Sequence, residues 1–307
     1  MNFRQLLYFV KTVEAGNITA AAEMLQLAQP ALGSQIRLLE KELGTPLLAR
    51  HSRGVTPTQA GAFLFERAKK ILAELDDTAR QVRGMATGDH AHVVLGVTPS
   101  MVMLLGPDLL LKARSALPHV SISLVEERSP VLLEALEAGH IDVAFLYNVA
   151  ERRNIARQAV IEEDLLLVTA PSAGTSHTPV SLAQALDHEL VIAGERGVIR
   201  KVVETEAARL SLRLRLAFEV HSVSSMKALV ARGTAASIMP WSLAAAELKA
   251  GTLAARRIDR PRLTRVLYLV EPENRRPAAE NAALKGFLDH IVSTMLEMIG
   301  PWARSLK

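Results

Sequence analysis

Residues 29–58 read QPALGSQIRLLEKELGTPLLARHSRGVTPT and combine a helical pattern with a turn-rich tail. Pro30 has the fixed φ that suits a first helical turn, and Gly44 suits the position just after a last one. We therefore expect a helix that begins near Pro30 and ends at Leu43. One face of this helix is apolar at helical spacing: Leu32, Ile36, Leu39 and Leu43. The opposite face is small or hydrogen-bonding: Gln29, Gly33, Ser34, Arg37 and Lys41.

Two shorter helices are expected before this one. The apolar residues of the first recur at steps of three and four and stop at Gly16: Phe3, Leu6, Leu7, Val10 and Val13. Asn17 can cap the second, because its side-chain oxygen accepts an otherwise unpaired backbone N–H. The second helix has a small apolar stripe: Ile18, Ala21, Ala22 and Leu25. The three helices predict a helix-turn-helix, whose third helix reads the major groove of DNA, although other three-helix folds share this pattern.

The segment from Leu43 to Thr58 is short and rich in turn residues, and it contains Arg50, Arg53 and Gly54. We interpret it as a β-wing that follows the third helix. A wing in this position strengthens the interpretation of the first 58 residues as a DNA-binding domain.

A long helix is expected from Thr58 to about Met85. Its inward positions alternate in steps of four and three, as in a heptad seam: Leu64, Ala68, Ile71, Leu75, Thr78, Val82 and Met85. A helix of about 28 residues extends roughly 42 Å, which is beyond the end of a small N-terminal domain. This length favours pairing with a second copy. The alternative is a single helix that packs on its own domain.

The pattern changes after Gly84, where Gly88 and Asp89 interrupt the helix. Short β-branched runs predict buried strands at 92–97, 120–125, 141–146, 165–168, 190–192, 214–220, 236–238 and 266–270. Helical stretches are expected between them at 107–116, 131–138, 198–208, 224–231 and 243–249. This alternation favours an α/β architecture with mainly parallel sheets.

Three polar segments follow predicted strands: Thr98-Pro99-Ser100, Arg128-Ser129-Pro130 and Ser222-Val223-Ser224-Ser225. In open α/β sheets, ligands bind at the carboxyl ends of strands beside helix N-termini, where free N–H groups favour anions. Helix capping explains each segment more simply when it is considered alone. Their recurrence at three strand ends favours a shared cleft for a small carboxylate or another anion.

The composition excludes several classes of protein. Lys and Arg number 36 against 32 Asp and Glu, so the formal net charge is only +4. The total charge therefore does not argue for a nucleic-acid partner, and any such case must rest on the local arrangement of particular residues. The absence of cysteine excludes disulfides and thiolate metal sites. Arg4, Lys11 and Glu14 interrupt the N-terminal apolar pattern, so we expect no signal peptide. No run of about 18 apolar residues predicts a membrane span. We expect a soluble, cytoplasmic protein.

Motifs for catalysis or cofactor binding are lacking: there is no Gly-x-Ser-x-Gly elbow, Walker-type phosphate loop, Gly-x-Gly-x-x-Gly turn or His-Glu-x-x-His helix. His90 and His92 could share a metal only with further ligands, and we favour solvated or packing histidines. The acidic runs Glu126-Glu127 and Glu162-Glu163-Asp164 are interpreted as surface charge, since neighbouring strand residues face opposite ways. We therefore expect no enzyme, no cofactor and no metal site.

The N-terminal region resembles that of the LysR-type transcriptional regulators over about 60 positions, an extent more specific than any single short motif. The matching residues are Ala20-Ala21-Ala22, Gln29-Pro30-Ala31-Leu32, Ile36, Leu39-Glu40, Leu43-Gly44, Leu47, Arg50, Arg53-Gly54 and Thr56-Pro57-Thr58-Gln59-Ala60-Gly61. The resemblance implies contact with the bases and backbone of double-stranded operator DNA by Gln29, Pro30, Gly33, Ser34 and Arg37. It also implies that Arg53 of the wing lies near a phosphate or the minor groove.

Two residues depart from the family pattern. Ala28 stands where the family often has Ser or Thr, so a helix-capping hydroxyl is missing. Gly33 replaces a common Ser or Thr and costs roughly 1 kcal/mol in helix propensity. For Arg50 we favour an internal ion pair that fixes the wing rather than contact with DNA. For Arg53 we favour contact with DNA rather than an internal ion pair. Arg37 could be a solvated residue that pairs with Glu40, but its family position favours DNA contact.

The resemblance implies an α+β multidomain protein in three parts. These are a winged helix-turn-helix domain over residues 1–58, a linker and dimerisation helix over 59–88, and a two-lobed α/β effector-binding domain of the periplasmic-binding-protein type over 89–307. The first lobe would comprise 89–163 and 268–307, and the second 164–267, with the chain crossing near 163 and returning near 267. The implied effector contacts are Thr98, Ser100, Arg128, Ser129, Val198, Ile199 and Ser222.

A transcription regulator is therefore the expected function. An antiparallel dimer would place two recognition helices on one face of DNA, so the operator should be an interrupted inverted repeat, and a homotetramer is expected by resemblance. A bound effector would alter DNA bending and access for RNA polymerase. The rival interpretation is a solute-binding protein of a transport system, which should carry an export signal and has no use for a DNA-binding domain. An α/β enzyme ranks third.

Overall fold

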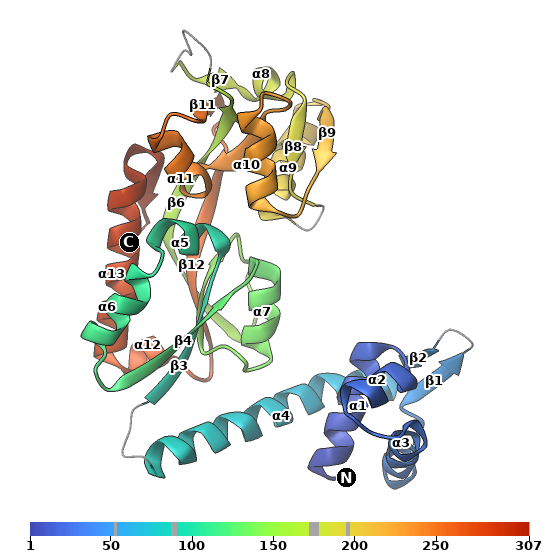
Figure 1. Ribbon diagram of the computed structural model, residues 1–307. Coiled ribbons are helices and arrows are strands. Elements are labelled where there is room, and N and C mark those ends of the chain that lie inside the picture. The colour runs from blue at the N-terminus through green and yellow to red at the C-terminus, as the bar shows by residue number, and fades with distance from the viewer. Residues whose placement is uncertain (52–53, 87–90, 172–177, 195–196, 307) are drawn as a thin grey trace. The chain divides into compact units, whose positions relative to one another are not determined.

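The computed structural model describes residues 1–51, 54–86, 91–171, 178–194 and 197–306, and it divides the chain into two units (Figure 1). The first unit comprises Met1–Asp89 and Ala138–His140, and the second comprises His90–Glu137 and Ile141–Lys307. Over the described residues, no helix combines the length and the apolar character that crossing a bilayer would require.

The first unit begins with three helices, α1 (Phe3–Ala15), α2 (Ile18–Met24) and α3 (Gln29–Leu43), as the sequence predicts. Gly16 ends α1 in the left-handed region at φ 63°. The Asn17 side chain accepts the backbone N–H groups of Thr19 and Ala20 and so caps α2. Gly44 ends α3, again left-handed, at φ 67°. Local cap chemistry thus sets all three helix boundaries.

These helices and the wing share one small core. Its fully or nearly buried residues include Phe9, Ala21, Ala22, Leu32, Ile36, Leu39, Leu47, Leu48 and Val55. Leu43 is an exception to the predicted apolar face, because it is 40% exposed. It is the last residue of α3, where the chain turns away at Gly44.

The β-wing forms as predicted. Strands β1 (Leu48–His51) and β2 (Gly54–Pro57) pair antiparallel, with Leu48 opposite Pro57 and Arg50 opposite Val55. Helix α4 (Gln59–Ala86) follows directly and is 28 residues long. Within α4, the side chains of 70, 73, 76, 77 and 80–86 lie outside the described set.

The second unit is built on a large mixed sheet with the strand order β4-β3-β5-β12-β6-β11-β7. Its strands are β3 (Ala91–Val97), β4 (Val120–Glu126), β5 (Val143–Tyr147), β6 (Ile155–Thr169), β7 (Val180–Ser181), β11 (Ala254–Arg260) and β12 (Thr264–Pro272). Strands β10 (Ser237–Pro240) and β13 (Ala303–Ser305) also pair with β6. A separate parallel pair joins β8 (Leu190–Ile192) to β9 (Leu216–Glu219).

The expectation of mainly parallel sheets is wrong. Strand β3 does pair in parallel with β4 and β5, but β10, β11, β12 and β13 all pair antiparallel with β6. The reason is that β6 is one strand of 15 residues, of which the sequence predicts only 165–168. Its first half carries charged residues and therefore lacks the apolar pattern of a buried strand.

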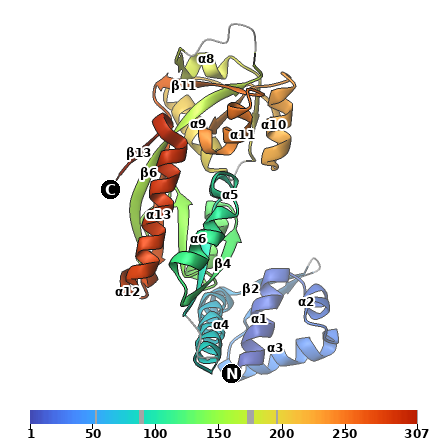
Figure 2. The same cartoon turned by 60° about the vertical axis from the view of Figure 1, so that its left-hand side comes forward.

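The helices of the second unit are α5 (Pro99–Leu105), α6 (Asp108–Ala116), α7 (Ser129–Glu137), α8 (Leu182–Leu186), α9 (Val198–Arg209), α10 (Val223–Ala231), α11 (Trp241–Lys249), α12 (Pro277–Glu280) and α13 (Ala282–Ile299), followed by the turn η1 (Gly300–Trp302). Helix α13 runs along β6 with α6 beside it (Figure 2). Helix α13 is absent from the predicted helices, although its buried residues recur at helical spacing: Leu284, Phe287, Leu288, Ile291, Val292, Met295 and Ile299.

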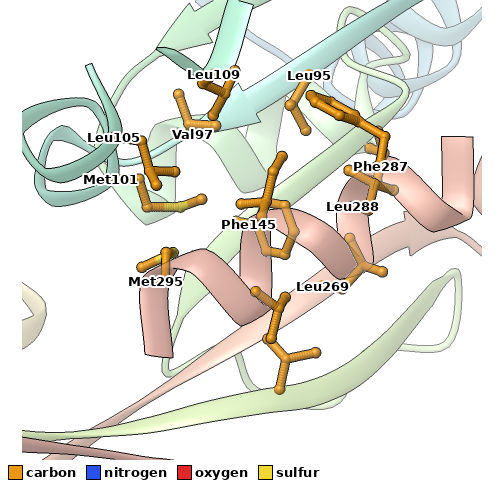
Figure 3. Close-up of a cluster of buried hydrophobic side chains, with 14 of the residues drawn as sticks. Leu95, Val97, Met101, Leu105, Leu109, Phe145, Leu269, Phe287, Leu288 and Met295 are labelled. Atoms are coloured by element: carbon orange, nitrogen blue, oxygen red, sulfur yellow. The ribbon is translucent and has the colours of Figure 1, made fainter. Parts of the chain in front are cut away.

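Separate hydrophobic cores define two lobes in this unit. The first lobe is centred on residues that include Leu95, Phe145, Leu269, Phe287 and Met295 (Figure 3). The second has its own core, which includes Leu165, Leu190, Val203, Ile238 and Ile258. Strand β6 contributes Ile161 to the first core and Leu165 to the second, so it passes between the lobes over these few residues. Strand β12 returns beside it, with Arg265 opposite Glu163.

Candidate DNA-binding face and effector site

A strip of polar residues on α3 faces solvent. Gln29, Ser34, Arg37 and Lys41 are exposed, as is Pro30 in the first turn. Ala28 supplies no side-chain cap at the start of the helix, as its departure from the family pattern predicts. The strip can therefore reach a partner without any rearrangement of the core.

Gly33 and Leu38 lie on α3 beside this strip but differ from its exposed polar residues. The backbone of Gly33 is buried, yet a Cβ added there would meet no atom within 4 Å, so a side chain at this position would project into open space. Leu38 is 48% exposed, one turn beyond Ser34. The sequence gives no signal for this exposure, because a lone leucine beside an apolar face is not informative.

Glu40 joins α3 to the wing. Its Oε1 accepts the backbone N–H of Leu47 at 2.8 Å and that of Leu48 at 3.1 Å. No ion pair between Glu40 and Arg37, the alternative considered for Arg37, is among the contacts of the described residues; the Glu40 carboxylate holds the backbone where β1 begins. A hydrogen bond to a backbone group seven residues away leaves no sequence signal beyond the family position itself.

The wing also lies against the end of α1. Val55 donates its N–H to the carbonyl of Gly16 at 2.8 Å, and a Cβ on Gly54 would lie 2.2 Å from that same oxygen. Arg50 is exposed, and no ion pair is recorded for it among the residues described, so the structure does not support its predicted role in fixing the wing. Arg53, like Ser52, lies outside the described residues.

Thr58 links the wing to α4. Its hydroxyl donates to the carbonyl of Pro46 at 2.8 Å and accepts the N–H of Gly61 at 3.0 Å, so Thr58 caps the helix. A Cβ on Gly61 would lie 1.9 Å from the Leu47 carbonyl oxygen. Only glycine fits this close approach, which explains the family motif that ends at Gly61.

The predicted seam of α4 divides into two parts. Ala68 is fully buried with Leu6 and Val10 of α1, and Leu64 packs on the same cluster, so this part contacts its own unit. Ile71 and Leu75 are 42% and 46% exposed. The side chains of Val82 and Met85 lie outside the described set. Among the seam residues whose side chains are described, packing on the helix's own domain is therefore observed at Leu64 and Ala68, and Ile71 and Leu75 are exposed.

The predicted effector residues at α5 are buried. Thr98 precedes α5 without a side-chain capping bond, and its Oγ1 lies 3.3 Å from the Ser100 Oγ. Ser100 is 2% exposed, and its Oγ accepts a hydrogen bond from Arg265 at 3.0 Å. Helix capping by the Thr98 hydroxyl is therefore not observed. Instead, both side chains belong to a polar group inside the domain.

The residues at α7 separate into one buried and one exposed side chain. Ser129, the first residue of α7, is 7% exposed, and its Oγ accepts the backbone N–H of Tyr147 at 2.9 Å. It thus ties α7 to β5. Arg128 is exposed, immediately before the helix.

The remaining predicted effector residues belong to the second lobe. Ser222 caps α10 by accepting the N–H of Ser225 at 3.3 Å, so the simpler interpretation holds for it. Val198 and Ile199 form the first turn of α9 and are half-buried. Val198 packs against the core of the first lobe, whereas Ile199 packs against cores of the second. The structure gathers Thr98, Ser100 and Ser129 around Tyr147, but it gives no direct contact between them and Ser222.

The interpretation of Glu162-Glu163-Asp164 as surface charge is wrong. Glu163 and Asp164 are fully buried. Asp164 pairs with Arg262 at 2.6 Å and Arg257 at 3.1 Å, and Glu163 pairs with Arg265 at 2.7 Å. These arginines lie about a hundred residues further along the chain, so the sequence offers no local sign of the pairing. Glu126 and Glu127 are exposed, as predicted.

Tyr147 completes the buried group around Glu163. Its hydroxyl donates to Glu163 Oε2 at 3.2 Å, and the guanidinium of Arg265 lies 3.5 Å from its ring centroid. Burial raises the pKa of Tyr147 well above its ordinary value, although the nearby Arg265 opposes this shift. The phenol therefore keeps its proton and remains a hydrogen-bond donor.

A winged helix-turn-helix, a long helix and a two-lobed α/β domain together define a DNA-binding regulator of transcription with a ligand-binding domain. The chain belongs to the LysR family: residues 3–62 match "Bacterial regulatory helix-turn-helix protein, lysR family" and residues 86–295 match "LysR substrate binding domain". The predicted family and fold class are thereby confirmed.

Curated relatives and solved structures agree with this assignment. The nitrogen assimilation regulatory protein nac of Klebsiella aerogenes is 33% identical over 298 residues, which cover 95% of this chain and 96% of that protein. The nac protein of Escherichia coli (strain K12) is 32% identical, over 96% of each chain. CbnR, a LysR family transcriptional regulator, has a TM-score of 0.65 and 27% identity, over 96% of this chain and 99% of its own. None of these similarities supports the transport alternative.

Proposed function

We propose that two copies of this chain bind an interrupted inverted repeat in double-stranded DNA through the outer faces of their α3 helices. The observation that carries this proposal is the exposed strip of Gln29, Ser34, Arg37 and Lys41. Such side chains hydrogen-bond to base edges or neutralise phosphates. Pro30, Gly33 and Arg53 complete the proposed DNA-contacting set. The similarity to CbnR, which has been crystallised with its target DNA, supports the same use of the domain.

Pairing of the two copies would use the exposed part of α4, where Ile71 and Leu75 continue the heptad seam beyond the contact with α1. We propose the functional division 1–58 for DNA binding, 59–88 for dimerisation and 89–307 for effector binding. Within the last part, 89–163 with 268–307 and 164–267 would act as the two lobes. Association of two such dimers would give a tetramer.

The proposed effector is a small carboxylate or another anion held between the lobes. Supporting observations are the exposed cation of Arg128 just before α7 and the N-termini of α7 and α10, where the helix dipole favours negative charge. The other proposed contacts are Thr98, Ser100, Val198 and Ile199. Effector binding would change DNA bending and access for RNA polymerase in the cytoplasm, without catalysis by this chain.

A mobility-shift experiment tests this function. The probe is the DNA beside the protein's own coding region, compared with a scrambled duplex of equal length and with a duplex that keeps only one half of any inverted repeat. We expect tight binding to the intact probe and weaker binding to the other two, because a dimer needs both half-sites. Equal binding to all three duplexes would contradict the proposal.

A further inference from the structure

The guanidinium of Arg265 lies where β6 and β12 pass between the lobes. Arg265 lies opposite Glu163 in the pairing of these strands. Its Nε and Nη2 donate to Glu163 Oε2 at 3.0 and 2.7 Å. The two side chains are only 5% and 0% exposed, so the ion pair is shielded from water.

The same Nη2 of Arg265 also contacts one helix from each lobe. It donates to the Ser100 Oγ in the first turn of α5 at 3.0 Å and to the Ser242 Oγ in the first turn of α11 at 2.9 Å. Glu163 Oε1 in turn accepts the backbone N–H of Ser242 at 3.1 Å. Both serines are buried, and α5 and α11 pack against each other. The Arg265–Glu163 pair is therefore bonded to both lobes.

A contribution to stability does not by itself explain the buried Arg265–Glu163 pair. A buried ion pair often contributes no more than an apolar replacement of equal volume, whereas a half-satisfied one is costly. Nη2 has two N–H groups for three acceptors, the Glu163 carboxylate and the two serine hydroxyls, so one N–H is shared, and all three contacts are made together only when α5 and α11 hold one relative position. Apolar contacts between the same helices would tolerate sliding. The arrangement thus favours one discrete lobe geometry over a continuum.

We propose that Arg265 is a positioning residue that couples the two lobes, and that lobe rotation requires release of Ser100 or Ser242 from its guanidinium. The proposal rests on the proposed function in that lobe rotation is the response to an effector. The coupling itself is a property of the free chain, and it holds whether or not the chain binds the operator or an anion.

The test uses the full chain without DNA or effector and measures amide hydrogen exchange by mass spectrometry. The variants are Ser100→Ala, Ser242→Ala and both together, with Ser115→Ala as the control, because Ser115 is an exposed serine on α6 that bonds only locally. Each single change removes a bond to a charged donor, so we expect exchange to rise roughly tenfold in α5 and also in α11. In the double variant, the fold-increase in exchange should be larger than in either single variant but smaller than the product of the two single increases.

Independent effects would overturn the coupling. If Ser100→Ala loosens only α5, if Ser242→Ala loosens only α11, and if the two effects multiply, then Arg265 does not connect the lobes. Arg265→Lys gives a second test, since it keeps the charge opposite Glu163 but lacks the planar fork that holds several acceptors. A folded Arg265→Lys chain should show faster exchange in both helices, and unchanged exchange would equally contradict the proposal. Should this variant fail to fold, the serine variants alone decide.

Discussion

Glu40 and Leu47 are joined by a hydrogen bond of 2.8 Å between a carboxylate oxygen on the recognition helix and the backbone N–H that precedes the wing. The same oxygen also accepts the N–H of Leu48. This contact fixes where β1 starts relative to α3. The two elements that are proposed to contact DNA are thereby held in one geometry before any DNA is bound.

Removal of this carboxylate should loosen the wing. We expect Glu40→Ala to destabilise the first unit by roughly 1.5–3 kcal/mol, because two backbone donors lose a charged acceptor. Glu40→Gln keeps an acceptor oxygen and should cost less than half as much. Thermal unfolding of both variants measures the effect, with Glu23→Ala on the exposed side of α2 as the control. Equal stability of Glu40→Ala and the control would show that the contact is unimportant.

Two glycines of the first unit have positive φ, and alanine substitutions at them would distinguish the cost of backbone strain from the cost of a steric clash. At Gly54, φ is 139° and a Cβ would lie 2.2 Å from the Gly16 carbonyl, whereas at Gly44, φ is 67° and a Cβ would meet nothing within 4 Å. We expect Gly44→Ala to cost about 1 kcal/mol from its φ alone. Gly54→Ala should cost roughly 3 kcal/mol or more, because the wing must also move. Denaturant unfolding of the two variants gives the comparison, and similar costs would argue against a tight wing.

The exposed part of α4 gives a test of dimerisation. Ile71→Lys with Leu75→Lys places charges on the proposed seam, so the chain should sediment as a smaller species, because unpaired charges are excluded from such an interface. Glu74→Lys changes the charge on the same helix at an exposed position outside the seam and should leave the sedimentation coefficient unchanged. Retention of the wild-type assembly by the double lysine variant would place the dimer contact elsewhere.

Glu271 should make stability depend on pH. Burial raises the pKa of its carboxyl above the usual value near 4.5, although the N–H of Ala278, which it accepts at 2.7 Å, acts in the opposite direction. A raised pKa in the folded state favours the protonated form, so the contribution of Glu271 to stability is greatest below the ordinary pKa and falls as pH rises through the folded value. Glu271→Gln should remove this fall in a series of unfolding measurements from acid to neutral pH. The exposed Glu297→Gln should retain it; identical profiles for the two variants would refute the assignment.

Local chemistry made the first unit predictable. Gly16, Asn17 and Gly44 act within a few residues of the helix ends that they set, so the sequence pattern contains the whole cause. The close approach of Gly54 to Gly16 was beyond prediction, because it depends on how the wing packs against α1. The exposed strip on α3 follows from helical spacing, with only the buried backbone of Gly33 as an exception.

Distant pairing limited the prediction of the second unit. Glu163 and Asp164 were expected at the surface, because a run of acidic residues has no visible reason to be buried until Arg265 and Arg262 are placed beside it. Arg157 and Glu162 interrupt the apolar pattern in the first half of β6, so that half was not predicted as a strand. Ser100 illustrates the limit at the candidate effector site: its position after a strand is predictable, whereas its hydrogen bond to Arg265 across the domain is not.

The measurement that tests DNA recognition by α3 most directly is the salt dependence of operator affinity for wild type and Arg37→Ala. The matched control is Arg114→Ala, which removes an exposed arginine from α6 of the second unit. If Arg37 contacts DNA, its loss should weaken binding and flatten the slope of log K against log salt by roughly one, while the control keeps both affinity and slope. An unchanged affinity and slope for Arg37→Ala would contradict the assignment of this helix face to DNA.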